Sequence, residues 1–230
     1  MKLMGIDGCK SGWVVASSNA DLTSLRFEIA PQLAGMFANA DRGVVFIAID
    51  IPIGLSTDGL RACDVAARQL LSKRHKSSVF PAPCRAALRA ADDYQQACAL
   101  SRAICGRSLS RQSHGILRKI REVDELMTPE RQARIREAHP EVTFATLAGR
   151  GLRYSKKCAD GWAERLRLLR RVGLRFDPAR ERFQHGCSRV APDDIIDAAA
   201  CLVTAWRVYR EMPREDVEID QKGLRMEIVA

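Results

Sequence analysis

The chain has 230 residues, 47% of them hydrophobic, and its lysines and arginines outnumber its aspartates and glutamates by 37 to 28. The length suits one globular domain, and the absence of a long apolar stretch and of a signal-peptide pattern excludes a membrane-spanning or exported protein, so we expect a cytoplasmic one. The positive charge attracts polyanions such as nucleic acid, although an arginine-rich composition also arises without a binding role.

The amino-terminal residues predict antiparallel strands. Residues 2–7 form a short apolar strand, and the glycines within 8–12 suit a turn because glycine adopts positive φ without strain. The predicted partner strand covers 13–17, and a third strand over 22–30 follows a turn signal.

A short helix and a buried strand come next. Pro31 suits the first turn of a helix, which we expect over 32–39. Residues 44–50 are apolar without interruption as far as Asp50, which is typical of a strand buried on both faces.

Residues 60–131 change in character, with alanine, leucine, arginine and glutamine replacing the β-branched residues. We predict helices over 60–71, 91–103 and 112–126. Residues 77–83 form a loop, because their two prolines remove helical hydrogen bonds. No linker composition separates this region, so we interpret it as a helical insertion in the same domain.

The carboxyl-terminal part predicts further helices. Residues 132–139 fit a helix end or a fifth strand, and we favour the strand because Pro140 disfavours a helical conformation at the residue before it. Helices are expected over 160–172 and 193–210, and a small hairpin over 217–229. The arginines at 165, 167, 170 and 171 are expected on an exposed helix side. The whole chain, 1–230, thus predicts one α/β domain.

Two aspartates follow apolar strands at the point where turn residues begin. Asp7 precedes Gly8, and Asp50 precedes the segment 51–54. Ligand and catalytic groups of α/β sheets gather at the carboxyl ends of the strands. An ionised carboxylate there requires a partner, because its desolvation is costly, and a divalent cation is one such partner.

The last predicted helix carries more acids in its first turns. Asp194 and Asp197 are three residues apart and share a face, and Asp193 is aligned nearly as well. Small residues along that face allow a close approach to a sheet. Bound Mg²⁺ or Mn²⁺ would explain these acids. The helix macrodipole is the alternative for Asp193 and Asp194, but it explains Asp197 less well.

Other candidate ligands are fewer. Glu141 follows the fifth strand and is either a further metal ligand or base, or an ordinary loop acid; His139 is either a proton shuttle or a structural residue. The eight cysteines show no two-residue spacing, so we expect free thiols and no zinc site.

Several segments resemble known proteins. Residues 5–13 are similar to the first hairpin of ribonuclease H-like proteins, and 194–200 resemble the last helix of Holliday-junction resolvases, where paired acids bind metal. More closely, the chain resembles an uncharacterised bacterial family known as domain of unknown function 429, or predicted RNase H-like nuclease. The segments that carry this resemblance are 5–9, 48–55, 77–83, 139–144, 155–157 and the last-helix acids.

The resemblance implies a ribonuclease H-like five-stranded mixed sheet flanked by helices, with the helical insertion (about 60–131) after the fourth strand. It also implies a two-metal nuclease site with Mg²⁺ or Mn²⁺. Asp7 would bridge both ions, Asp50 would hold one, Asp194 and Asp197 the other, and Glu141 would position water. The residues expected to meet substrate phosphate are Arg74, Lys76, Ser77, Ser78, His139, Ser155 and Lys156.

The chain departs from resolvases and ribonuclease H, because Asp50 rather than glutamate ends the central strand and Glu141 has no obvious counterpart. The substrate therefore stays open among RNA, DNA, hybrids, junctions and small phosphodiesters. Two other functions also stay open: a non-catalytic binding or scaffold protein with this fold, and an actin-like ATPase or phosphotransferase. An actin-like protein requires a second glycine-rich phosphate loop, and we find none in this sequence.

Overall fold

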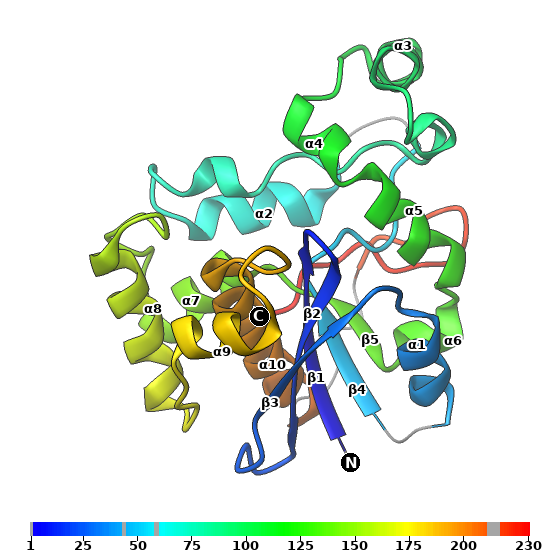
Figure 1. Ribbon diagram of the computed structural model, residues 1–230. Helices are drawn as coiled ribbons and strands as arrows, with labels where there is room; N and C mark the ends of the chain where they lie inside the picture. The colour runs from blue at the N-terminus through cyan, green and yellow to red at the C-terminus, as the bar shows by residue number, and fades with distance from the viewer. Residues whose placement is uncertain (1, 43–44, 58–59, 211–216) are drawn as a thin grey trace.

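The computed structural model describes residues 2–42, 45–57, 60–210 and 217–230 and has an α/β architecture (Figure 1). Its centre is a five-stranded mixed sheet in the order β3-β2-β1-β4-β5. The strands are β1 (Lys2–Cys9), β2 (Gly12–Asn19), β3 (Arg26–Ala30), β4 (Val45–Ile49) and β5 (Ile135–Glu137). The first three pair antiparallel, whereas β4 and β5 continue parallel to β1. The predicted fold class is confirmed, and the sheet is compatible with a ribonuclease H-like arrangement.

The strand ends differ from prediction for local reasons. β1 and β2 run further towards their shared turn, and Gly12, the first residue of β2, adopts a φ of 120°. β3 begins only at Arg26, because the Asn19 side chain accepts a hydrogen bond from the Thr23 backbone and holds the preceding residues in a turn. Val44, the predicted first residue of β4, lies outside the described residues.

The predicted helical insertion lies between β4 and β5. Its elements are α2 (Ala62–Leu70), α3 (Tyr94–Cys105), α4 (Arg111–Gly115), α5 (Leu117–Leu126), α6 (Pro129–Gln132) and two 3₁₀ turns, Lys76–Ser78 and Arg85–Ala90. The predicted helix over 112–126 is in fact two helices, because the backbone leaves the helical conformation at Ile116. That the insertion and the sheet form one domain stays a prediction.

The other helices cover the two faces of the sheet. They are α1 (Ala34–Asp41), α7 (Pro140–Ala148), α8 (Ala159–Arg171), α9 (Pro178–His185) and α10 (Pro192–Arg210). The helices α8 and α10 match their predictions to within one residue. The strand predicted over 132–139 is present but shorter, as β5, because Gln132 still belongs to α6. The sequence analysis does not anticipate α7 and α9. The β-branched and aromatic residues of α7 have low helix propensity, and their burial decides the outcome.

Alternate residues of each central strand enter different apolar clusters. In β4, Ile47 and Ile49 pack on the side of α1 and the insertion, whereas Phe46 and Ala48 pack on the side of α10. In Figure 1, α7 to α10 lie on one side of the sheet and α1, α5 and α6 on the other. This double burial explains the uninterrupted apolar pattern of the strand.

The carboxyl-terminal tail completes the fold. An antiparallel bridge joins Ile219 to Arg225, close to the predicted hairpin, and a parallel bridge joins Ala138 to Val229 beside β5. All eight cysteines are free, as expected. In the part of the chain that the structure describes, no helix is both long enough and apolar enough to span a membrane.

The contact between α10 and β1 is exceptionally close at Gly5. A Cβ atom built on Gly5 would lie 1.9 Å from the Leu202 nitrogen and 2.2 Å from the Ala198 oxygen. Both neighbours are backbone atoms of α10, so no side-chain rotation can make room. The absence of a side chain at this position therefore sets the distance between the last helix and the first strand.

We predict that Gly5→Ala destabilises the protein by about 3 kcal/mol or more, because the methyl group forces α10 away from the sheet. Gly35→Ala is the matched control. Nothing lies within 4 Å of the position in α1, so the added helix propensity should leave stability equal or slightly higher. Urea denaturation of both variants measures the difference, and equal stabilities would contradict the role assigned to Gly5.

Candidate active site

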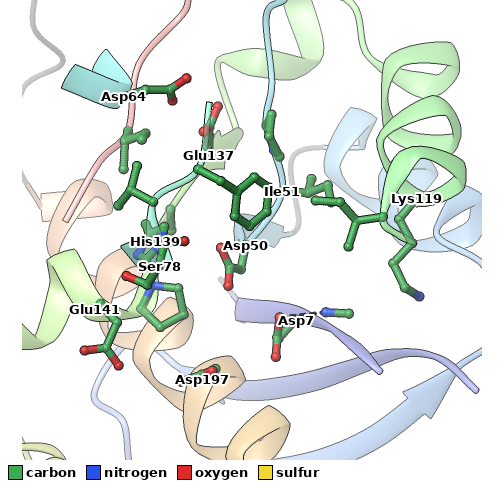
Figure 2. A pocket seen from close by; sticks show the side chains of 18 of the residues that line it. Asp7, Asp50, Ile51, Asp64, Ser78, Lys119, Glu137, His139, Glu141 and Asp197 are labelled. Carbon is green, nitrogen blue, oxygen red and sulfur yellow. Dashed lines mark hydrogen bonds between the residues drawn. The ribbon is translucent and has the colours of Figure 1, made fainter. Parts of the chain in front are cut away.

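A pocket of about 260 Å³ opens at the carboxyl ends of β1, β4 and β5. Backbone hydrogen bonds align these three ends. The Asp50 nitrogen donates to the Ile6 oxygen at 2.9 Å, and the Ala138 nitrogen donates to the Ile49 oxygen at 2.9 Å. Parallel pairing thus brings Asp50 beside Asp7 on one side and His139 on the other (Figure 2). The polar residues that line this pocket include Asp7, Asp50, His139, Glu141, Lys156 and Asp197.

Three predicted ligands, Asp7, Asp50 and Asp197, meet in this pocket. Burial raises the pKa of Asp7 well above its ordinary value, and the charges of Asp50 and Asp197 raise it further. Burial is the main cause that raises the pKa of Asp50 to about 6. The charge of Asp197 raises this pKa further, whereas a charged His139 opposes the rise. These three carboxylates, called the acidic triad below, repel one another and require positive charge nearby.

Lys156 supplies one positive charge. It precedes α8, and its Nζ donates to Oδ2 of Asp197 at 2.6 Å. Burial raises the pKa of Asp197, and the nearby ammonium partly reverses that rise. The other oxygen of Asp197, Oδ1, is buried and has no hydrogen-bond partner in the described residues. The triad therefore keeps an unsatisfied buried acceptor beside its ion pair.

Asp194 lies next to the acidic triad but does not line the pocket. Its Oδ2 accepts a hydrogen bond of 2.9 Å from the backbone nitrogen of Ala191, which satisfies the start of α10. Burial raises the pKa of Asp194 to about 6. Its charge also raises the pKa of Asp7, so it contributes to the field of the site. Asp194 therefore stabilises the start of α10, as the helix-terminus alternative implies, and its role as a metal ligand stays a prediction.

Glu141 lines the pocket from the first turn of α7, and a buried arginine holds it. Nη2 of Arg165 donates to both Glu141 oxygens, at 2.6 and 2.7 Å, and Nε donates to Oε1 at 3.0 Å. The Arg165 side chain is 1% exposed, so its predicted place on an exposed helix side is wrong. The sequence pattern misleads because α8 packs against the loop before it. Glu141 is anchored by a guanidinium.

The residues predicted to bind substrate phosphate divide into two groups. Ser78, His139 and Lys156 line the pocket, and His139 Nε2 lies 3.3 Å from the Ser78 oxygen. His139 Nδ1 is buried without a partner in the described residues. The others lie outside the pocket lining, with Arg74, Lys76 and Ser77 exposed and Ser155 partly exposed.

A buried charge network in the pocket wall escaped the sequence analysis. Arg61 donates to both oxygens of Glu137 at 2.7 Å and also pairs with Asp64. Glu137 accepts from the Ile53 nitrogen at 2.6 Å, so the network anchors the segment that follows Asp50. Burial raises the pKa of Glu137 to about 7. An acid near the end of the predicted fifth strand was a visible signal, but its partner Arg61 is distant in sequence.

The donor set of the acidic triad suits a hard divalent cation. Carboxylate oxygens are the ligands that Mg²⁺ prefers, and the unpartnered buried Oδ1 of Asp197 provides an acceptor in the pocket. Among the described residues, no three His, Cys, Asp or Glu side chains stand together in an arrangement ready to hold a metal ion. Small side-chain movements within the triad would therefore accompany binding.

Comparison with known proteins identifies a family but no activity. The family model described as "Protein of unknown function (DUF429)" matches residues 5–215. No curated protein and no solved structure matches the chain.

We predict that Asp50→Asn stabilises the metal-free protein by about 1–2 kcal/mol at pH 8, because it removes a charge that is disfavoured first by burial and then by repulsion from Asp197. The native carboxyl has a pKa of about 6, above the ordinary value of 3.8. The gain is therefore complete above pH 6 and is lost as the pH falls towards 4. Thermal denaturation across this range, with the exposed Asp21→Asn as control, measures it. A stabilisation by Asp50→Asn that grows on acidification would show that the charge of Asp50 is not its cause.

We also predict that Arg165→Met costs about 3–5 kcal/mol, because it leaves Glu141 buried and unpaired. Adding Glu141→Gln should recover much of this loss, since a neutral amide is cheaper to bury. Arg167→Met, on the exposed side of the same helix, should change stability by less than about 0.5 kcal/mol. Chemical denaturation of the four proteins gives the values; a double variant no more stable than Arg165→Met would argue against the pairing.

Proposed function

The chain belongs to the DUF429 family, whose description names no activity, and we propose from its acidic site that it is a metal-dependent nuclease hydrolysing phosphodiester bonds. The observation that carries this proposal is the convergence of Asp7, Asp50 and Asp197 in one pocket, although they are distant in sequence. Asp7 and Asp197 are buried and Asp50 is half-buried, and carboxylates in such positions oppose folding unless a cation compensates them. A function that requires these carboxylates therefore explains their presence in one pocket better than a contribution to stability does.

The triad would hold Mg²⁺ or Mn²⁺ through its carboxylate oxygens. Bound there, the cation would lower the pKa of water and stabilise the leaving oxygen of the phosphodiester. Asp7 is flanked by Asp50 and Asp197, whose charges both act on it, which agrees with a central role among the ligands. Asp194 would strengthen the negative field from the start of α10.

The other pocket residues would bind and orient the substrate. His139 lies beside Asp50 in the pocket lining, and its imidazole would take or donate a proton at the reacting phosphate. Lys156 presents its ammonium at the mouth of the triad, since its side chain is 37% exposed. Glu141, held by Arg165, would shape the pocket wall in place of the predicted water-positioning role.

Nucleic acid is the proposed substrate class. The chain has a formal net charge of +9, which favours association with a polyanion. Exposed Arg74 and Lys76 lie on the loop that leads to Ser78 in the pocket and would contact phosphates away from the cleaved bond. The eight free thiols suit a reducing compartment, so we expect the protein to act in the cytoplasm.

A non-catalytic binding protein is the second candidate. The ion pair between Lys156 and Asp197 favours it, because that pair satisfies part of the triad without a metal. Such a protein would bind nucleic acid equally well with and without divalent cations and would leave it intact.

We predict that the full chain cleaves at least one member of a panel of labelled RNA, DNA, hybrid and junction substrates with Mn²⁺ or Mg²⁺, and that EDTA abolishes cleavage. Asp7→Asn should lower the rate more than about 100-fold, since even changes outside the inner ligand shell cost 10–100-fold. Asp21→Asn, an exposed change, should cleave like the wild type. Gel electrophoresis of the products measures cleavage. Equal amounts of product from the wild type and from Asp7→Asn would contradict the nuclease assignment.

A further inference from the structure

Lys156 is fixed at the mouth of the acidic site by more than its own ion pair. The indole Nε1 of Trp162 donates to the Lys156 oxygen at 2.5 Å, and the Cys158 nitrogen donates to the Ser155 oxygen at 3.2 Å. These bonds tie the segment 155–158 to the first turn of α8. An unconstrained surface lysine would not have its backbone fixed in this way.

The helix α8 can approach this segment because Gly161 has no side chain. A Cβ atom at Gly161 would lie 1.8 Å from the Ser155 oxygen. On the same side, Nη1 of Arg165 donates to the oxygens of Gly161 and Tyr154, at 2.9 and 3.2 Å. The guanidinium that anchors Glu141 therefore also fixes the chain just before Lys156, and the ammonium is aimed by buried structure.

The ammonium satisfies only one oxygen of Asp197. Its Nζ lies 2.6 Å from Oδ2, whereas Oδ1 is buried and unpartnered in the described residues, on a side chain that is 5% exposed. Asp7 and Asp50 face the same space (Figure 2). Three ionised carboxylates beside one ammonium leave two negative charges, which a single divalent cation would neutralise.

We propose that Lys156 takes the place of a second divalent ion, so that the site binds one Mg²⁺ or Mn²⁺ through Asp7, Asp50 and Oδ1 of Asp197. This inference rests on the proposed function, because the ammonium would then be available to bind the phosphate of the substrate. It replaces the two-ion site that the sequence resemblance implies. A lysine binds phosphate as a point charge with three donors, as this position requires.

The test counts ions without substrate. The full chain is titrated with Mn²⁺ alone, and bound Mn²⁺ is measured by electron paramagnetic resonance. The wild type and Lys156→Arg should bind one ion per chain, and Lys156→Ala should bind two, because the space and the charge are then free. Lys157→Ala, the exposed neighbour, is the matched control and should bind one.

Two ions in the wild type, or one ion in Lys156→Ala, would overturn the inference. Circular dichroism confirms that each variant is folded, and thermal denaturation gives a second readout. Mn²⁺ should raise the Tm of Lys156→Ala more than that of Lys157→Ala, because the variant lacks its internal cation. Equal increases would count against the inference.

The same proteins separate this inference from the nuclease proposal. Cleavage by the wild type with two bound ions would keep the nuclease and refute the role of Lys156. One ion in the wild type and two in Lys156→Ala, without cleavage of any substrate, would support the role of Lys156 and refute the nuclease. If both hold, Lys156→Ala should cleave roughly 100-fold more slowly at Mn²⁺ concentrations that fill only its first site, as expected for a lost cation at developing charge.

Discussion

The backbone-to-backbone contact between Gly5 and α10 is the constraint on which the site depends. Asp7 lies two residues after Gly5 on β1, and Asp197 lies one residue before Ala198, whose oxygen a Cβ atom at Gly5 would strike at 2.2 Å. A side chain at this point would separate the strand from the helix and move the two carboxylates apart. Close packing of apolar and small residues thus creates an electrostatic problem in the pocket, because it brings mutually repelling carboxylates together.

That problem is solved only in part within the chain. Lys156 compensates one oxygen of Asp197, and His139, when charged, lowers the pKa of Asp50, yet the pKa values of the triad stay raised. Stability alone would favour neutral residues in these positions. Sites that retain mutual repulsion in a pocket are typical of functional residues, where a ligand supplies the missing charge.

Two buried arginines anchor the segments that surround the acidic triad. Arg61 fixes Glu137 and, through it, the segment after Asp50. Arg165 fixes Glu141 and the segment before Lys156. Each arginine joins elements that are distant in sequence, and each carboxylate is hydrogen-bonded on both oxygens. The groups that would meet metal and substrate are therefore positioned by hydrogen bonds from two buried arginines.

Local patterns determined much of the fold. Uninterrupted apolar runs identified β1 and β4, the carboxylates at their ends identified Asp7 and Asp50, and the amphipathic last helix brought Asp197 into the same hypothesis. These features follow from periodicity and from the rule that parallel strands end at one sheet edge. The residue types alone carried this information, because each signal lies within a few neighbouring positions.

Only the tertiary structure decided which charges are partners. Glu141 and Arg165 are 24 positions apart and Lys156 and Asp197 are 41 apart. The sequence left Glu141 open between a metal ligand or base and an ordinary loop acid, and it placed Arg165 on an exposed helix side. Nothing in the local pattern of α8 reveals that Gly161 allows this helix to pack against the loop before it. A salt bridge depends on distances that packing sets after the elements form, so its partners cannot be derived from periodicity.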